Sequence, residues 1–77
     1  MEVLGPIRDI QIIAAGRGVH SRRALSREFG DGRWRKMKGV AMVRWYDGRL
    51  CEAEIHWHEA HGIGRVLIKG KRALRWL

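Results

Sequence analysis

The stretch GVAMVRWYDGRLCEAEIHWHE, residues 39–59, decides the fold of this chain. Its second half alternates apolar and polar residues, and its first half, rich in apolar residues, ends at Asp47-Gly48, a dipeptide that strongly favours a tight turn. An alternation with period two is typical of a strand with one buried face. We therefore expect an antiparallel hairpin with strands over residues 39–46 and 50–59.

The parity of the apolar positions predicts the register of this hairpin. Odd positions from 41 to 45 and from 51 to 57 are apolar, whereas the even positions 52, 54, 56 and 58 are glutamate or histidine. A two-residue loop would pair odd with even positions and mix the two faces of the sheet. A three-residue loop over residues 46–48, with Gly48 as a left-handed bulge, keeps the faces separate. The expected pairs are then Gly39 with Ile55, Ala41 with Ala53, and Val43 with Cys51.

Upstream of the hairpin, the chain predicts one strand and one helix. The isoleucine-rich segment 7–14 favours a strand, and the glycines at 16 and 18 favour a turn after it. Ser21 suits the N-cap of a short helix that ends at Gly30. A helix of about nine residues does not persist alone, so it must pack on a sheet.

Downstream of the hairpin, residues 60–64 predict a loop and residues 65–71 a last strand. The tail 72–77 either extends that strand or forms a helical stub. The expected fold class is α+β, with one short helix packed on a small antiparallel sheet. The expected order is strand, helix, then a three-stranded meander.

Length and composition indicate one folded domain over residues 1–77. An apolar fraction of 45% and four tryptophans argue against disorder. Cys51 is the only cysteine, which excludes an internal disulfide and a cysteine zinc site. Such a fold suits a reducing compartment, and no stretch resembles a signal peptide or a membrane span. We expect a cytoplasmic protein with no membrane partner and no cofactor.

Charge is the strongest indication of function. Sixteen lysines and arginines face eight acidic residues, which gives a net charge of +8. Residues 17–38 hold eight basic and two acidic residues, and residues 65–77 hold five basic and none acidic. Residues 47–59 have the opposite sign, with one arginine against four carboxylates. Positive charge segregated in this way predicts a polyanionic partner.

The basic segments predict a surface that binds nucleic acid, with RNA favoured over DNA. Trp34 lies between Arg33 and Arg35, an arrangement that suits a stacked base with phosphates on either side. The alternative is that Trp34 belongs to the core. RNA is favoured because a sheet with an aromatic side chain suits unstacked bases and because no helix is shaped for a major groove. The expected binding residues are Arg17, Arg22, Arg23, Arg33, Trp34, Arg35, Lys36, Lys38, Lys69, Lys71 and Arg72.

A cluster of histidines and glutamates predicts an alternative function, a metal-independent endoribonuclease. Such an enzyme needs a base for the 2′-hydroxyl, an acid for the leaving oxygen and a cation on the phosphate. The candidates are His56, Glu59, His61 and Arg65. Histidines two apart on a strand can also bind a metal, but the polar face of a half-buried strand gives the same pattern, so we expect none.

A third alternative is an interaction module. The acidic segment of one copy would then meet the basic segments of another, and the product would be an oligomer. A homodimer would also enlarge the thin core of so short a chain.

The segments GRWRKMKG (32–39) and AEIHWHEAHGIG (53–64) resemble blocks of a family of small uncharacterised bacterial proteins. The resemblance covers residues 16–72 and implies a bacterial, cytoplasmic origin without implying an activity. The family pattern commonly has an aromatic residue where this chain has His58, which argues against a role for that histidine. The expected fold also resembles the barnase-like and toxin-type ribonucleases, by architecture alone.

Overall fold

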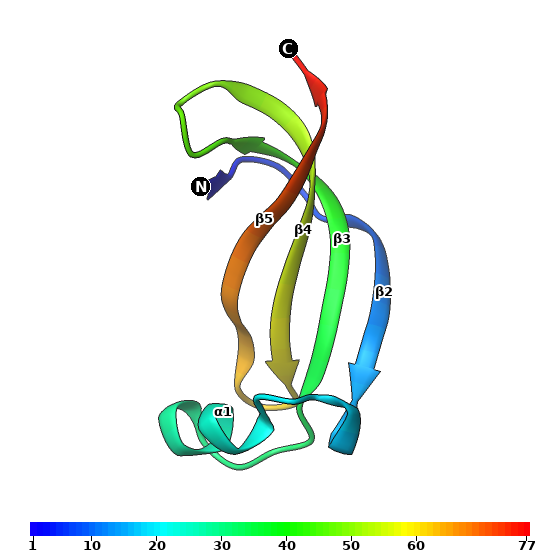
Figure 1. Ribbon diagram of the computed structural model, residues 1–77, viewed down its shortest axis with the longest axis vertical. Helices are drawn as coiled ribbons and strands as arrows, with labels where there is room; N and C mark the ends of the chain where they lie inside the picture. The colour runs from blue at the N-terminus through cyan, green and yellow to red at the C-terminus, as the bar shows by residue number, and fades with distance from the viewer.

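The computed structural model describes all 77 residues. One short helix and a strongly twisted antiparallel sheet make up the fold, which confirms the α+β class (Figure 1). The elements in chain order are β1 (Glu2–Val3), β2 (Arg8–Ala15), the 3-10 turn η1 (Gly16–Gly18), α1 (Arg22–Phe29), β3 (Arg35–Arg44), β4 (Leu50–Ala60) and β5 (Gly64–Trp76).

The hairpin of β3 and β4 has the predicted register. Gly39 pairs with Ile55, Ala41 with Ala53, and Val43 with Cys51. The loop has three residues, because the amide of Trp45 donates to the carbonyl of Arg49 at 2.7 Å, and Gly48 has φ of 89°. The alternation of apolar and polar residues therefore sufficed to fix both the pairing and the turn.

The sheet is larger than the sequence predicts. Strand β3 begins at Arg35, four residues before the expected start, because the lower half of β3 pairs with β2 on one side and β4 on the other. The short strand β1 was not expected and pairs with the upper end of β3. The tail extends β5 to Trp76, which settles the alternative between strand and helical stub. Strand β5 forms one edge of the sheet, and β1 and β2 both pair with β3 along the other.

Two apolar clusters hold the fold together. The sheet core lies on the odd-numbered face of β3 and β4 and includes Ile55 and Trp57, with Cys51 fully buried among them. The helix core joins α1 to the lower end of the sheet, and its buried members are Val19, Leu25, Trp34 and Ala60. Because α1 contributes only Leu25 to the buried set, its attachment depends on the residues that surround that leucine.

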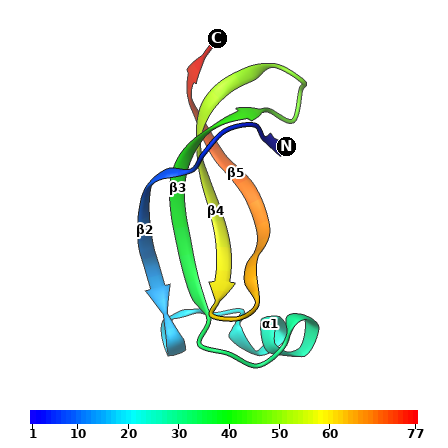
Figure 2. The same ribbon diagram turned by 180° about the vertical axis from the view of Figure 1, so that it is seen from behind.

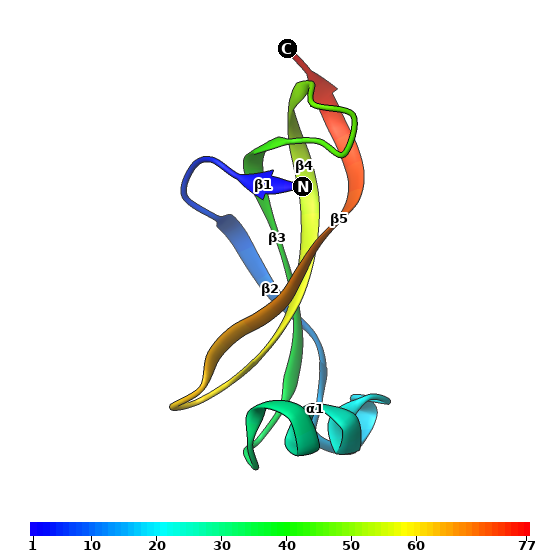
Figure 3. The same cartoon turned by 90° about the vertical axis from the view of Figure 1, so that its left-hand side faces the viewer.

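Helix α1 crosses one end of the sheet, and both chain termini lie at the other end (Figures 1 and 2). The side view shows how the twist of the strands leaves the helix beneath the sheet (Figure 3). Ser21 occupies the N-cap position as predicted, but its side chain makes no capping hydrogen bond. The chain has no helix with the length and apolar character needed to traverse a bilayer.

Candidate nucleic-acid interface

The basic side chains divide into two groups according to their partners. Of the sixteen, seven have a carboxylate within 4.0 Å: Arg8, Arg35, Arg44, Arg49, Arg65, Arg72 and Arg75. The other nine have none, and we call them unpaired: Arg17, Arg22, Arg23, Arg27, Arg33, Lys36, Lys38, Lys69 and Lys71. The unpaired group contains every lysine of the chain and all five arginines of residues 17–33.

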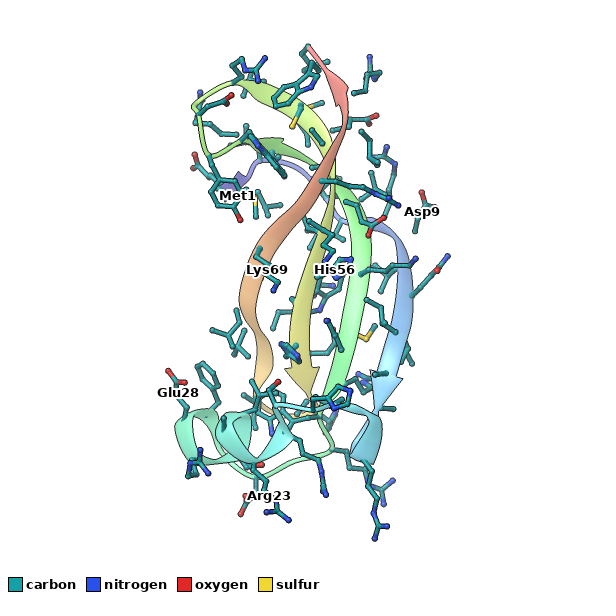
Figure 4. The ribbon with its side chains drawn as sticks, in the orientation of Figure 1. Met1, Asp9, Arg23, Glu28, His56 and Lys69 are labelled. Carbon is teal, nitrogen blue, oxygen red and sulfur yellow. The ribbon has the colours of Figure 1, made fainter.

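Four unpaired arginines line one cavity at the helical end of the molecule. Arg22, Arg23 and Arg27 come from α1, and Arg33 comes from the segment between α1 and β3. This arginine cavity has a volume of about 570 Å³ and is also lined by Ser26, Asp31, Trp34 and two glycines. Figure 4 shows Arg23 projecting from α1 away from the sheet. Arg27 was not among the binding residues expected from the sequence, although its position one helical turn after Arg23 places both side chains on one face of the helix.

Three unpaired lysines gather on the even-numbered face of the sheet. Lys36 lies opposite His58, and Lys38 lies opposite His56, whose other neighbour across the sheet is Lys69. We call Lys36, Lys38 and Lys69 the lysine face. Figure 4 shows His56 and Lys69 on neighbouring strands, above the end that carries Arg23. Lys71 occupies a bulge of β5 beyond this group.

His58 connects the lysine face to α1. Its Nε2 lies 3.5 Å from the Oγ of Ser21, the residue before Arg22, and its Nδ1 is buried without a hydrogen-bond partner. Burial, followed by the positive charges of Lys36 and Lys69, lowers the pKa of His58 below its usual 6.5. His58 thus lies beside Lys36 of the lysine face and next to Ser21, the residue before α1.

The lowered pKa of His58 predicts a loss of stability in mild acid. The pKa of His58 is 6.5 in the unfolded chain and lower in the folded protein, so at pH values below 6.5 the unfolded chain binds the proton more readily. The free energy of unfolding therefore falls as the pH drops below 6.5. When urea unfolding is measured at about pH 7.5 and 5.5, we expect the free energy of unfolding to fall less between these two pH values in His58→Gln than in wild type. Lys36→Gln should act in the same direction, because it removes one of the ammonium groups. An unchanged pH dependence in both variants would contradict this account.

Two arginines expected at the interface are held by carboxylates of the same chain. Arg35 donates to Glu59 at 2.7 Å, and Arg72 donates to Glu54 at 3.1 Å. The pKa of Glu54 is lowered, first by its hydrogen bond with His56 and then by Arg72. Both arginines are therefore paired within the chain, and their contact with phosphate stays a prediction.

The acidic segment is also neutralised within the chain. Glu52 is paired with Arg8 and Arg75, Glu54 with Arg72, and Glu59 with Arg35. Asp47 is paired with Arg49 at 2.8 Å. The four carboxylates of this segment therefore each have a partner in the same chain, and the interaction module stays a prediction.

Trp34 belongs to the core and does not present its ring to a base. The side chain is only 2% exposed and packs within the helix core, with its ring 6.2 Å from that of Phe29. Its Nε1 donates to the carbonyl of Gly30 at 3.3 Å. The prediction of base stacking on Trp34 is wrong, because the apolar side of α1 needs a large ring against which to pack.

The predicted catalytic cluster is not assembled around a single point. His56 is 8% exposed and hydrogen-bonded to Glu54 at 2.7 Å on the even face of β4. Glu59 accepts from the Nε1 of Trp57 at 2.7 Å, on the odd face. Side chains on the even and odd faces of a strand point in opposite directions, so His56 cannot act on the same phosphate as Glu59. The correction follows from parity: 56 and 59 differ by an odd number.

The other three candidates do lie near one another. Glu59, His61 and Arg65 line a shallow cavity of about 290 Å³ at the turn between β4 and β5, together with Arg35. Glu59 is already engaged by Arg35 at 2.7 Å, and Arg65 lies 3.9 Å from it. No group of three or more histidine, cysteine and acidic side chains is arranged to hold a metal ion.

Comparison of this chain with known protein families, curated proteins and solved structures finds no match. The resemblances to a bacterial family and to small ribonucleases stay predictions. Function is therefore inferred from the charge and geometry of the chain itself.

Proposed function

We propose that this protein binds single-stranded RNA through the lysine face and the arginine cavity. The observation that supports the proposal is the set of nine basic side chains without a carboxylate within 4.0 Å. Like charges held together repel one another and oppose compaction unless a polyanion neutralises them. The pattern of pairing supports a function for this charge, because seven other arginines are neutralised inside the chain.

A single strand fits this surface better than a duplex does. Helix α1 is eight residues long and packs across the end of the sheet, so it does not project as a helix in a major groove would. The lysine face lies along extended strands, where an unstacked polynucleotide can follow the sheet. With Trp34 buried, contact with the phosphate backbone is the main source of affinity, and we expect little base preference.

The test is the dependence of binding on salt. A fluorescent 12-nucleotide RNA should bind the protein, with log K falling linearly against log salt concentration. If each of the seven cations of the lysine face and the arginine cavity met one phosphate, the slope would be about −5, since each contact to a single strand contributes about −0.7. Fluorescence anisotropy at several salt concentrations measures it. A flat salt dependence, or no binding at low salt, would refute the proposal.

Two control ligands define the specificity. A DNA strand of the same sequence tests the preference for RNA, and an RNA duplex tests the preference for single strands. Equal affinity for the RNA and DNA strands would overturn the preference for RNA, and the protein would then bind single-stranded nucleic acid of either kind. Tighter binding of the duplex would overturn the single-strand assignment.

A further inference from the structure

The arginine cavity and the lysine face space their charges differently. Lys36 and Lys38 are two residues apart on β3, which separates their Cα atoms by about 6.6–6.8 Å. Cations spread along a strand can meet the phosphodiesters of an extended polynucleotide one by one. The arginine cavity instead gathers four guanidinium groups around a single volume of about 570 Å³.

The charge of the cavity exceeds what one internal phosphodiester can neutralise. Asp31 lines the same cavity, but no basic nitrogen lies within 4.0 Å of its carboxylate, so it reduces the local charge to +3 without occupying an arginine. An internal phosphodiester brings one negative charge. A terminal phosphate monoester brings about −1.5 to −2 at pH 7, and a triphosphate brings more.

The shape and chemistry of the cavity also suit a terminal phosphate. Guanidinium groups bind phosphate oxygens in pairs, and several can surround a group whose oxygens are not blocked by a second ester. The cavity is the largest of the four in the molecule and falls within the size range of small-molecule sites. Arg23, one of its lining residues, lies at the helical end of the molecule, and Lys69 lies higher on the sheet (Figure 4).

We propose that the arginine cavity binds the terminal phosphate groups of an RNA strand, a 5′-triphosphate above all, while the following nucleotides lie along the lysine face. The proposal rests on the proposed function, because it assigns the two parts of the same surface to two parts of one ligand. RNA ends would then be bound in preference to internal segments.

The experiment compares three RNA strands of identical sequence that carry a 5′-hydroxyl, a 5′-monophosphate or a 5′-triphosphate. At fixed salt concentration and pH 7.5, we expect the triphosphate strand to bind at least tenfold more tightly than the hydroxyl strand, with the monophosphate strand between them. Competition with inorganic triphosphate and with a nucleoside triphosphate separates an RNA end from a free nucleotide as the source of the phosphate.

Matched variants assign the preference to the cavity. Arg23→Ala with Arg33→Ala should reduce the preference for the triphosphate strand to less than threefold. Lys38→Ala with Lys69→Ala removes the same amount of charge. This variant should weaken the binding of all three strands equally and retain the preference for the triphosphate strand. Circular dichroism spectra must match wild type in both, since all four side chains are solvent-accessible and outside the apolar clusters.

The outcomes separate this inference from the proposed function. Equal binding of the three strands overturns the terminal-phosphate assignment and leaves RNA binding intact. Failure of all three to bind overturns RNA binding itself. Tighter binding of a nucleoside triphosphate than of the triphosphate strand overturns the RNA end as the ligand, and so does an unchanged preference in the arginine variant.

Discussion

Trp34→Ala is expected to lower the free energy of unfolding by about 3–5 kcal/mol, the usual cost of removing a buried aromatic ring. Trp34 is the largest buried side chain of the helix core and contacts the set that holds α1 to the sheet. A chain of 77 residues has a total stability of about 4–12 kcal/mol at about 0.05–0.15 kcal/mol per residue. The variant should therefore be close to unfolding, as urea denaturation followed by circular dichroism would show.

Trp76→Ala is the matched control for this prediction. Trp76 is 43% exposed, with Arg49 lying over its ring at 3.8 Å and Trp45 at its edge, so the same substitution should cost about 1 kcal/mol. Trp34→Phe should fall between the two, because it keeps an aromatic ring in the helix core. If Trp34→Ala were as stable as Trp76→Ala but bound RNA much more weakly, then Trp34 would be a binding residue after all.

Charge reversal in the arginine cavity is expected to weaken RNA binding by about 100-fold. Arg23→Glu with Arg27→Glu removes two contacts to phosphate, each worth about 1.5–3 kcal/mol, where 1.4 kcal/mol is a factor of ten. The slope of log K against log salt should also become shallower by about 1.4, since two phosphate contacts are lost. Anisotropy with the 12-nucleotide RNA that carries a 5′-triphosphate measures both quantities.

The control for charge reversal changes the net charge by the same amount elsewhere. Arg44→Glu with Arg75→Glu alters two arginines that are paired with Glu2 and Glu52, at the end of the sheet that holds the termini. Binding should weaken by less than fivefold, because only the long-range field changes. Equal losses in the two double variants would mean that net charge, and not the arginine cavity, governs binding.

The parts of the fold that the sequence determined are those with local causes. The register of β3 and β4 followed from the parity of Ala41 and Ala53, because period two in a strand leaves one pairing that keeps the apolar face intact. The loop before Arg49 and the position of α1 depended on glycines and on a run of helical spacing. Each cause lies within a few residues of its effect, so no knowledge of distant partners was needed.

Bulges mark the point at which sequence parity stops being informative. Strand β5 has three register shifts against β4, so Lys69 lies beside His56 although one position is odd and the other even. Each extra residue exchanges the faces of everything that follows. Lys69 was therefore predicted as a binding residue from the sequence, but its place on the same face as Lys38 could not be predicted.

The sequence by itself determined that the chain is one basic α+β domain, how its central hairpin pairs, and that its charge is divided between segments. Only the tertiary structure decided which cations are neutralised, because the partners of Arg35 and Arg72 come from β4, 24 and 18 residues away. It also decided that Trp34 is buried, whereas the opposite facing of His56 and Glu59 already followed from their parity on a predicted strand. Burial and ion pairing depend on which distant segments meet, and that is set by packing of the whole chain.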